Sequence, residues 1–128
     1  MKSYVILLAT EDSAVEAVVK RMGSAGDFEF HCARTSREAV SMLMDGAWNQ
    51  DLAVVDVDLP EGGRALVTTA GGSLPVIVIS GKAKPWLTSM VRHRRIGASL
   101  GKPLSLEKLR DAFRRVLSSA VTGAASGR

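Results

Sequence analysis

The sequence predicts an open α/β fold, in which a mostly parallel sheet of five strands lies between two layers of helices. Short apolar segments typical of buried strands alternate with segments whose apolar residues recur at helical spacing. Glycine, proline or small polar residues mark most of the boundaries between them. Because parallel neighbours need crossover connections, five such units place helices on both faces of the sheet.

The length and composition predict one domain. A chain of 128 residues with 46% hydrophobic content is long enough for a single core and too short for two. We expect residues 1–118 to form this domain and residues 119–128, which are small and polar, to form a flexible tail. No apolar run approaches the roughly 20 residues that cross a membrane, and no leader cleavage site follows Met1, so we expect a cytoplasmic protein.

Five segments have the composition of strands. The third and fourth are almost continuous apolar runs rich in β-branched residues, which is typical of strands buried on both faces. The fifth has room only for a short or irregular strand. The expected strands are residues 4–9, 28–32, 52–57, 75–80 and 98–101.

Capping residues mark the helices between these strands. Asp12 or Ser13 caps the first helix, Thr35 and Glu38 form a capping box for the second, and Ser105 caps the last. Glycine or Gly-Gly closes most of them. The expected helices are residues 13–23, 36–45, 64–70, 85–95 and 106–118.

Polar residues follow the carboxyl ends of four predicted strands. In an open parallel sheet these ends lie at one edge, and ligands bind beyond them where the strand order reverses. The residues are Thr10, Glu11 and Asp12 after the first strand, Asp56 and Asp58 at the third, Ser80 and Gly81 at the fourth, and Lys102 and Pro103 at the fifth.

Four segments at these strand ends resemble the motifs of a known family. LLATEDS, VVDVDLP, VIVISG and GKPLS are similar, in that order, to the acidic, aspartate, hydroxyl and Lys-Pro motifs of the response regulator receiver domain, the phosphoacceptor module of two-component signalling. The resemblance covers residues 4–117. It implies a flavodoxin-like, doubly wound (βα)5 fold. Four motifs at one edge of one sheet are more specific than any single motif.

The resemblance implies a role for each site residue. Asp56 would accept the phosphoryl group, and Asp56, Glu11 and the backbone carbonyl of Asp58 would bind Mg²⁺, which prefers hard oxygen ligands. Ser80 would hydrogen-bond a phosphoryl oxygen. Lys102 would offset the phosphoryl charge of roughly −1.5 to −2 near pH 7. The peptide bond after this lysine would be cis, as is usual in the family.

Several features depart from the family pattern. Thr10 stands where the first of two acids is usual. Asp58 adds a carboxylate beside the phosphorylation site, which would either restore the lost charge or repel the phosphoryl group. No Phe, Tyr or Trp lies between Trp86 and Phe113. The usual coupling of the hydroxyl to an aromatic residue in the fifth strand therefore cannot operate unchanged, unless Trp86 or His93 substitutes for that residue.

The net charge of +4 conceals an asymmetry along the chain. Residues 1–81 carry 6 Lys or Arg against 11 Asp or Glu, whereas residues 82–115 carry 10 against 2. One interpretation is ordinary solvated helix faces. The other is an acidic pocket in the first half and a basic docking surface in the second. Because no nucleic-acid-binding motif accompanies the basic segment, we rank an acidic protein partner above nucleic acid.

Three functional classes compete. We prefer a single-domain response regulator receiver that accepts a phosphoryl group on Asp56 from a histidine kinase or phosphotransfer protein and signals through a partner protein. The alternative is a pseudo-receiver, a protein-binding module that works without phosphorylation. The third is an enzyme, because DVD also resembles the aspartyl-phosphate loop of haloacid dehalogenase-type phosphatases. The chain has no room for that family's cap or further motifs, so we expect at most autophosphatase activity.

Overall fold

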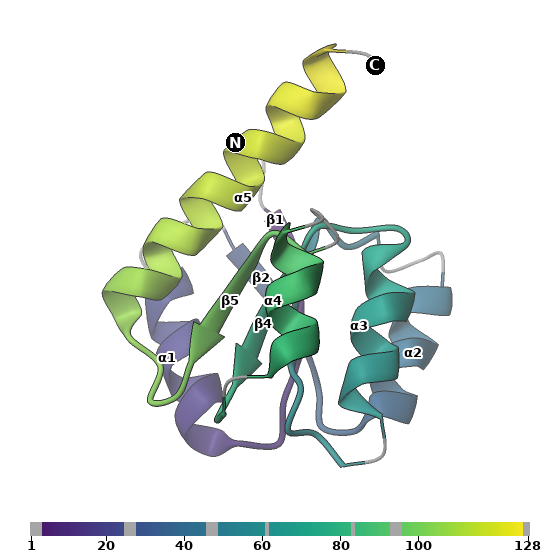
Figure 1. Cartoon of the computed structure of the whole chain (residues 1–128), viewed down its shortest axis with the longest axis vertical. Coiled ribbons are helices and arrows are strands. Elements are labelled where there is room, and N and C mark those ends of the chain that lie inside the picture. The colour runs from purple at the N-terminus through teal and green to yellow at the C-terminus, as the bar shows by residue number, and fades with distance from the viewer. Residues whose placement is uncertain are drawn as a thin grey trace.

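The computed structural model describes residues 4–24, 28–45, 49–60, 62–82, 84–92 and 96–126, with side chains as far as residue 118. Strands and helices alternate along this part of the chain (Figure 1). The elements are β1 (Tyr4–Ala9), α1 (Ser13–Gly23), β2 (Phe28–Ala33), α2 (Ser36–Met44), β3 (Leu52–Asp56), α3 (Gly63–Gly71), β4 (Val76–Ser80), α4 (Pro85–Arg92), β5 (Ala98–Gly101) and α5 (Leu106–Ser126).

The strands form one parallel sheet in the order β2-β1-β3-β4-β5. Helices α1 and α5 cover one face, and α2, α3 and α4 cover the other (Figure 1). This arrangement confirms the predicted doubly wound fold with a short fifth strand. The strand order reverses between β1 and β3, where Leu8 is in register with Val54. Thr10 and Asp56 therefore come next to each other at the carboxyl ends of two central strands.

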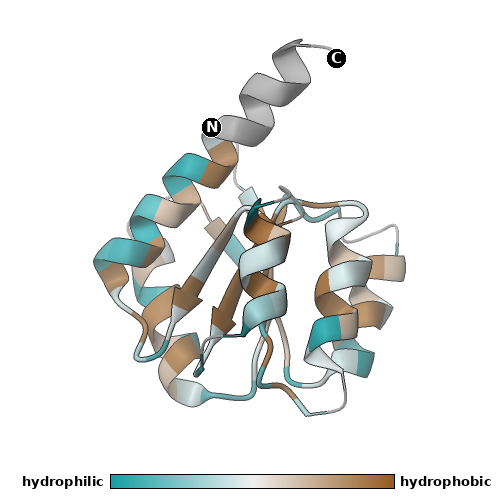
Figure 2. Cartoon of the chain, viewed as in Figure 1, coloured by the Kyte–Doolittle hydropathy of each residue, from teal (hydrophilic) through white to brown (hydrophobic). Residues whose placement is uncertain are grey.

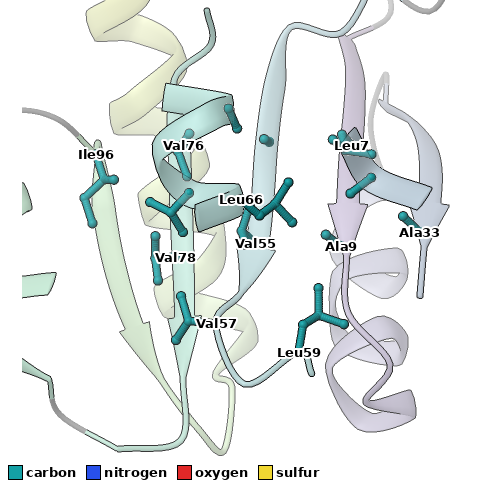
Figure 3. Packing of buried hydrophobic residues seen from close by; sticks show 14 of the residues in the cluster. Leu7, Ala9, Ala33, Val55, Val57, Leu59, Leu66, Val76, Val78 and Ile96 are labelled. Carbon is teal, nitrogen blue, oxygen red and sulfur yellow. The ribbon is translucent and has the colours of Figure 1, made fainter. Parts of the chain in front are cut away.

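Alternation along the strands divides the core into two layers. Ile6 and Leu8 of β1 point toward α1 and α5, whereas Leu7 and Ala9 point toward the opposite helices. Figure 3 shows the second layer, in which Leu66 of α3 packs over the sheet. Burial of one such aliphatic side chain stabilises the folded state by roughly 1.5–3 kcal/mol. Figure 2 shows hydrophobic strands, with hydrophilic residues most frequent on α5.

The predicted caps of α1 and α2 are confirmed. Asp12 Oδ1 accepts hydrogen bonds from the N–H groups of Ala14 and Val15, at 2.9 and 3.4 Å. Thr35 Oγ1 accepts one from the N–H of Glu38, at 3.0 Å. These bonds satisfy helix N–H groups that have no partner within the helix. None of the helices, searched over the residues that the structure describes, is long and apolar enough to cross a membrane.

The third strand ends one residue earlier than predicted, and the end is a turn. The N–H of Leu59 donates to the carbonyl oxygen of Asp56 at 3.1 Å, and the N–H of Asp58 donates to Asp56 Oδ1 at 3.0 Å. Such side-chain bonding to the backbone competes with the strand ladder. The turn, rather than an extended chain, carries Asp58 back to the same side as Asp56.

Helix α4 is described from Pro85 to Arg92, and its predicted last residues 93–95, which include His93, lie outside the described residues. Helix α5 continues to Ser126, through most of the segment 119–128 that the sequence suggested as a tail (Figure 1). The backbone of residues 119–126 therefore extends the last helix of the domain.

Candidate functional site

Asp56 is a buried carboxylate at the end of the central strand β3. Its side chain is 3% exposed. Oδ2 accepts a hydrogen bond from Thr10 Oγ1 at 2.7 Å and lies 3.0 Å from Lys102 Nζ. Oδ1 accepts the hydrogen bond from the N–H of Asp58. Both oxygens of this buried group therefore have donors, as burial of a charge requires.

The ammonium group of Lys102 forms ion pairs with three carboxylates. Its Nζ lies 3.0 Å from Asp56 Oδ2, 3.2 Å from Asp58 Oδ2 and 3.3 Å from Asp12 Oδ2. We call these four residues the acidic cluster. A lysine ammonium has three N–H donors, and here each one faces a carboxylate. The cluster carries a net formal charge of −2, from three carboxylates and one ammonium.

The cluster shifts the ionisation of its members. Partial burial opposes the charge of Lys102, but hydrogen bonds with Asp56 and Asp58 outweigh it and raise the pKa of this ammonium above its ordinary value. Burial likewise opposes ionisation of Asp58, yet the N–H of Gly81 and the charge of Lys102 lower the pKa of its carboxyl. The pKa of Asp12 is lowered by the N–H of Ala14 and by Lys102. These groups stay ionised at neutral pH.

Ser80 lies at the same edge of the sheet, but its hydroxyl is engaged elsewhere. The buried Oγ donates to the carbonyl oxygen of Lys82 at 2.6 Å and accepts from the N–H of Lys82 at 3.3 Å. The carbonyl oxygen of Ser80 accepts a bond from the N–H of Lys102 at 3.0 Å. The backbone therefore ties Ser80 to Lys102, while the hydroxyl closes the loop after β4.

Two acidic residues, Glu11 and Asp12, follow β1. The sequence-based interpretation favoured Glu11 as a metal ligand and Asp12 as a helix cap. Glu11 is exposed, and among the residues that the structure describes its carboxylate forms no hydrogen bond or ion pair with the Asp56 site. Asp12 Oδ1 caps α1, and its Oδ2 lies 3.3 Å from Lys102 Nζ. The predicted capping role of Asp12 was the signal in the sequence that could have placed this residue at the site, because an N-cap side chain is held close to the end of the preceding strand.

The chemistry of the cluster suits a hard divalent cation, but its geometry does not present a ready site. Carboxylate oxygens are the ligands that Mg²⁺ prefers. Across the described ranges, no group of three or more His, Cys, Asp or Glu side chains is arranged to hold a metal ion. Lys102 Nζ occupies the point where the three carboxylates converge. The oxygen donors are therefore of the kind that suits a divalent cation, whereas their arrangement in this structure surrounds the Lys102 ammonium.

A small cavity lies beside Ser80, next to the fifth strand. Its volume is about 260 Å³, and its lining includes Ser80, Leu87, Thr88 and Ser99. Trp86, which the sequence suggested as a substitute for an aromatic residue in the fifth strand, lies in α4. Trp86 is half-buried against the α2–α4 side of the core, with the guanidinium of Arg64 4.8 Å from its ring centroid.

The peptide bond between Lys102 and Pro103 is cis, as expected.

The fold has close counterparts among solved structures, although no family model and no curated protein matches the sequence. A receiver domain protein of Methanospirillum hungatei JF-1, described as CheY-like, is 20% identical, with 95% of this chain and 99% of that one aligned at a TM-score of 0.83. The chain has the receiver-domain fold.

Receiver domains from two other organisms agree with this assignment. The signal receiver domain of a putative Luxo repressor protein from Vibrio parahaemolyticus is 15% identical, covers 99% of both chains and gives a TM-score of 0.83. The receiver domain of an HD domain-containing protein from Pseudomonas fluorescens Pf-5 is 21% identical, covers 94% of this chain and 99% of that one, and gives a TM-score of 0.81. The receiver fold therefore extends over nearly the whole chain.

Proposed function

We propose that this protein is a single-domain response regulator receiver that accepts a phosphoryl group on Asp56. One observation carries the proposal: a buried carboxylate at the end of a central strand lies 3.0 Å from a lysine ammonium that another strand end supplies. The receiver-domain fold supports a response regulator role. A histidine kinase or phosphotransfer protein is the proposed donor.

The proposed reaction is an in-line transfer to a carboxylate oxygen. An oxygen of Asp56 attacks phosphorus, an oxygen–phosphorus bond forms, and the bond from phosphorus to the donor's imidazole nitrogen breaks. The leaving nitrogen keeps the electron pair. Lys102 stabilises the charge that builds on the phosphoryl oxygens, because its ammonium already faces Asp56.

Charge explains why a divalent cation belongs to this proposal. The acidic cluster carries −2 before the donor arrives, and the phosphoryl group adds roughly −1.5 to −2. Asp56, a carboxylate after β1 (Asp12 or Glu11) and the backbone carbonyl of Asp58 would hold Mg²⁺. When bound, this ion supplies the positive charge that screens the approaching anion.

Ser80 would complete the phosphoryl site after a change of partner. Its hydroxyl donates to the carbonyl of Lys82, so it becomes available to a phosphoryl oxygen only when that bond breaks. The cavity beside Ser80 gives the side chain space for this movement. Rearrangement of the loop after β4 is thus the proposed structural response to phosphorylation.

The test is phosphorylation by acetyl phosphate with intact-mass readout. We expect a Mg²⁺-dependent gain of one phosphoryl mass that is absent in Asp56→Asn and absent when the metal is chelated. Asp51→Asn is a matched control, because Asp51 is a carboxylate just before the same strand and bonds the backbone of Val5. A gain that survives Asp56→Asn would contradict the proposed acceptor.

A phosphorylation-independent pseudo-receiver is the second candidate. The observation that favours it is the Lys102 ammonium at the centre of the acidic cluster, which supplies a positive charge without any metal. Under this alternative Asp56 is structural. No mass gain with any phosphodonor, together with partner binding that Asp56→Asn leaves unchanged, would favour the pseudo-receiver.

The basic second half is the proposed surface for a downstream partner. Arginine side chains are exposed on the outer faces of α4 and α5, and Lys108 adds to them. An acidic protein surface complements this charge. Binding should weaken in moderate salt and in a variant that reverses charge at these positions: Arg92, Arg110, Arg114 and Arg115.

A further inference from the structure

Asp58 links three loops through one carboxylate oxygen. Its Oδ2 accepts a hydrogen bond from the N–H of Gly81 at 2.8 Å and lies 3.2 Å from Lys102 Nζ. The side chain thereby joins the ends of β3, β4 and β5. A Cβ atom at position 81 would lie 2.9 Å from this oxygen, so glycine allows the close approach.

Asp58 occupies donors that an anion beside Asp56 would need. The three N–H groups of Lys102 already face three carboxylates, which leaves no free donor for a phosphoryl oxygen. The N–H of Gly81, at the next strand end, is also taken by Asp58. A phosphoryl group on Asp56 can bond these donors only if a carboxylate releases them.

Asp58 is better placed to leave than the other two carboxylates. Asp56 is buried and receives bonds on both oxygens. Asp12 caps α1 with its second oxygen, so its movement would expose N–H groups of that helix. The Asp58 side chain is 36% exposed and that of Asp12 35%, so both are open to water, but Asp58 caps no helix and water can replace its contacts.

We propose that the Asp58 carboxylate is an internal anion that holds Gly81 N–H and Lys102, and that the phosphoryl group arriving at Asp56 displaces it. This inference rests on the proposed function and concerns the same site. Asp58 is a positioning residue in this scheme, because it acts through Lys102 and Gly81 rather than on phosphorus. It limits how readily Asp56 is phosphorylated.

Removal of the Asp58 carboxylate should increase the rate at which Asp56 is phosphorylated. Without the Asp58 carboxylate the cluster carries −1 instead of −2, and two donors are free for the phosphoryl oxygens. The initial rate of labelling by acetyl phosphate, at fixed Mg²⁺, should rise about tenfold, the size of effect that one nearby like charge has on ionisation.

Three variants separate charge from hydrogen bonding. Asp58→Asn keeps an oxygen that can accept from Gly81 but removes the charge, Asp58→Ala removes both, and Asp58→Glu restores the charge on a longer side chain. We expect faster labelling in Asp58→Asn and Asp58→Ala and a rate near the wild type in Asp58→Glu. Asp111→Asn is the matched control, since it removes a carboxylate on the exposed face of α5.

The amide resonance of Gly81 reports the contact without phosphorylation. It should shift in Asp58→Ala, and in the wild type when beryllofluoride and Mg²⁺ are added. Labelling at the wild-type rate in both Asp58→Asn and Asp58→Ala, or a Gly81 amide that does not move in Asp58→Ala, would overturn the inference. Absence of labelling in the wild type and every Asp58 variant, with a shifted Gly81 amide, would instead overturn the proposed function and support Asp58 as the internal ligand.

Discussion

Thr10 Oγ1 donates a 2.7 Å hydrogen bond to Asp56 Oδ2 across the two central strands of the sheet. The same hydroxyl oxygen accepts from the N–H of Asp12 at 3.0 Å. The receiver family usually has an acid where Thr10 stands, and an acid there would add a charge. Thr10 instead supplies a neutral donor to the buried carboxylate, which lowers the cost of burying it.

Replacement of Thr10 by valine should destabilise the protein. Valine has nearly the same shape but no hydroxyl, so Asp56 Oδ2 loses a donor while remaining buried. A hydrogen bond to a charged group contributes about 1.5–3 kcal/mol, and we expect a loss of that size in the free energy of unfolding. Urea denaturation of Thr10→Val and the hydroxyl-retaining control Thr10→Ser measures it. Equal midpoints for the two variants would contradict the prediction.

Loss of the Lys102 charge should leave three carboxylates facing one another. We expect Lys102→Met to cost about 3 kcal/mol, because removal of one partner leaves the others uncompensated. The double variant Lys102→Met/Asp58→Asn should recover part of this loss, since one repelling charge is gone. Denaturant unfolding of both variants measures the coupling. A double variant no more stable than Lys102→Met would show that repulsion is not the cause.

The acidic cluster should make stability fall in acid. The pKa of Asp58 is lowered in the folded protein, so the unfolded chain binds more protons below neutral pH. The stabilisation is present above the ordinary carboxyl pKa of 3.8 and is lost as the pH falls through the lower folded value. Thermal unfolding between roughly pH 5 and pH 3 should therefore show a smaller loss of stability in Asp58→Asn than in the wild type. An equal loss of stability with falling pH in the two proteins would contradict the assignment of this loss to Asp58.

Substitution of Gly81 by alanine is a second way to displace the Asp58 carboxylate. In Gly81→Ala the new methyl group would lie 2.9 Å from Asp58 Oδ2, so the carboxylate must move away. If Asp58 restrains phosphorylation, Gly81→Ala should also label faster than the wild type. In an Asp58→Ala background, Gly81→Ala should give no further increase in the labelling rate, because both changes release the same donors. If the rate increases of the two single variants combine in the double variant, the two changes act on labelling independently.

The sheet and the edge that carries the site were predictable from local patterns. The apolar runs before Asp56 and Ser80 leave little choice but buried parallel strands, and polar residues at the ends of such strands must share one edge. Thr35 and Asp12 marked helix starts because side-chain caps are local interactions. These features depend on residues close together in the sequence.

The side-chain network could not be predicted in the same way. Glu11 and Asp12 both precede α1, and Asp12 is an extended N-cap residue, so which carboxylate faces the site depends on the path of the loop after β1 and not on helical spacing. Residues more than forty positions apart bring Lys102 against Asp12 and Asp58. The open question about Asp58, whether it restores or repels charge, depended on its partners, and those are Gly81 and Lys102.

The stacking of Arg64 on Trp86 connects α3 to α4 and gives the molecule an optical reporter. A cation above an indole ring alters its excited state, so tryptophan emission responds to the separation of these two helices. Any displacement of α4 that follows a change at Ser80 would thus alter fluorescence without an attached dye. In a Trp48→Phe background, this single indole would follow loop rearrangement in real time.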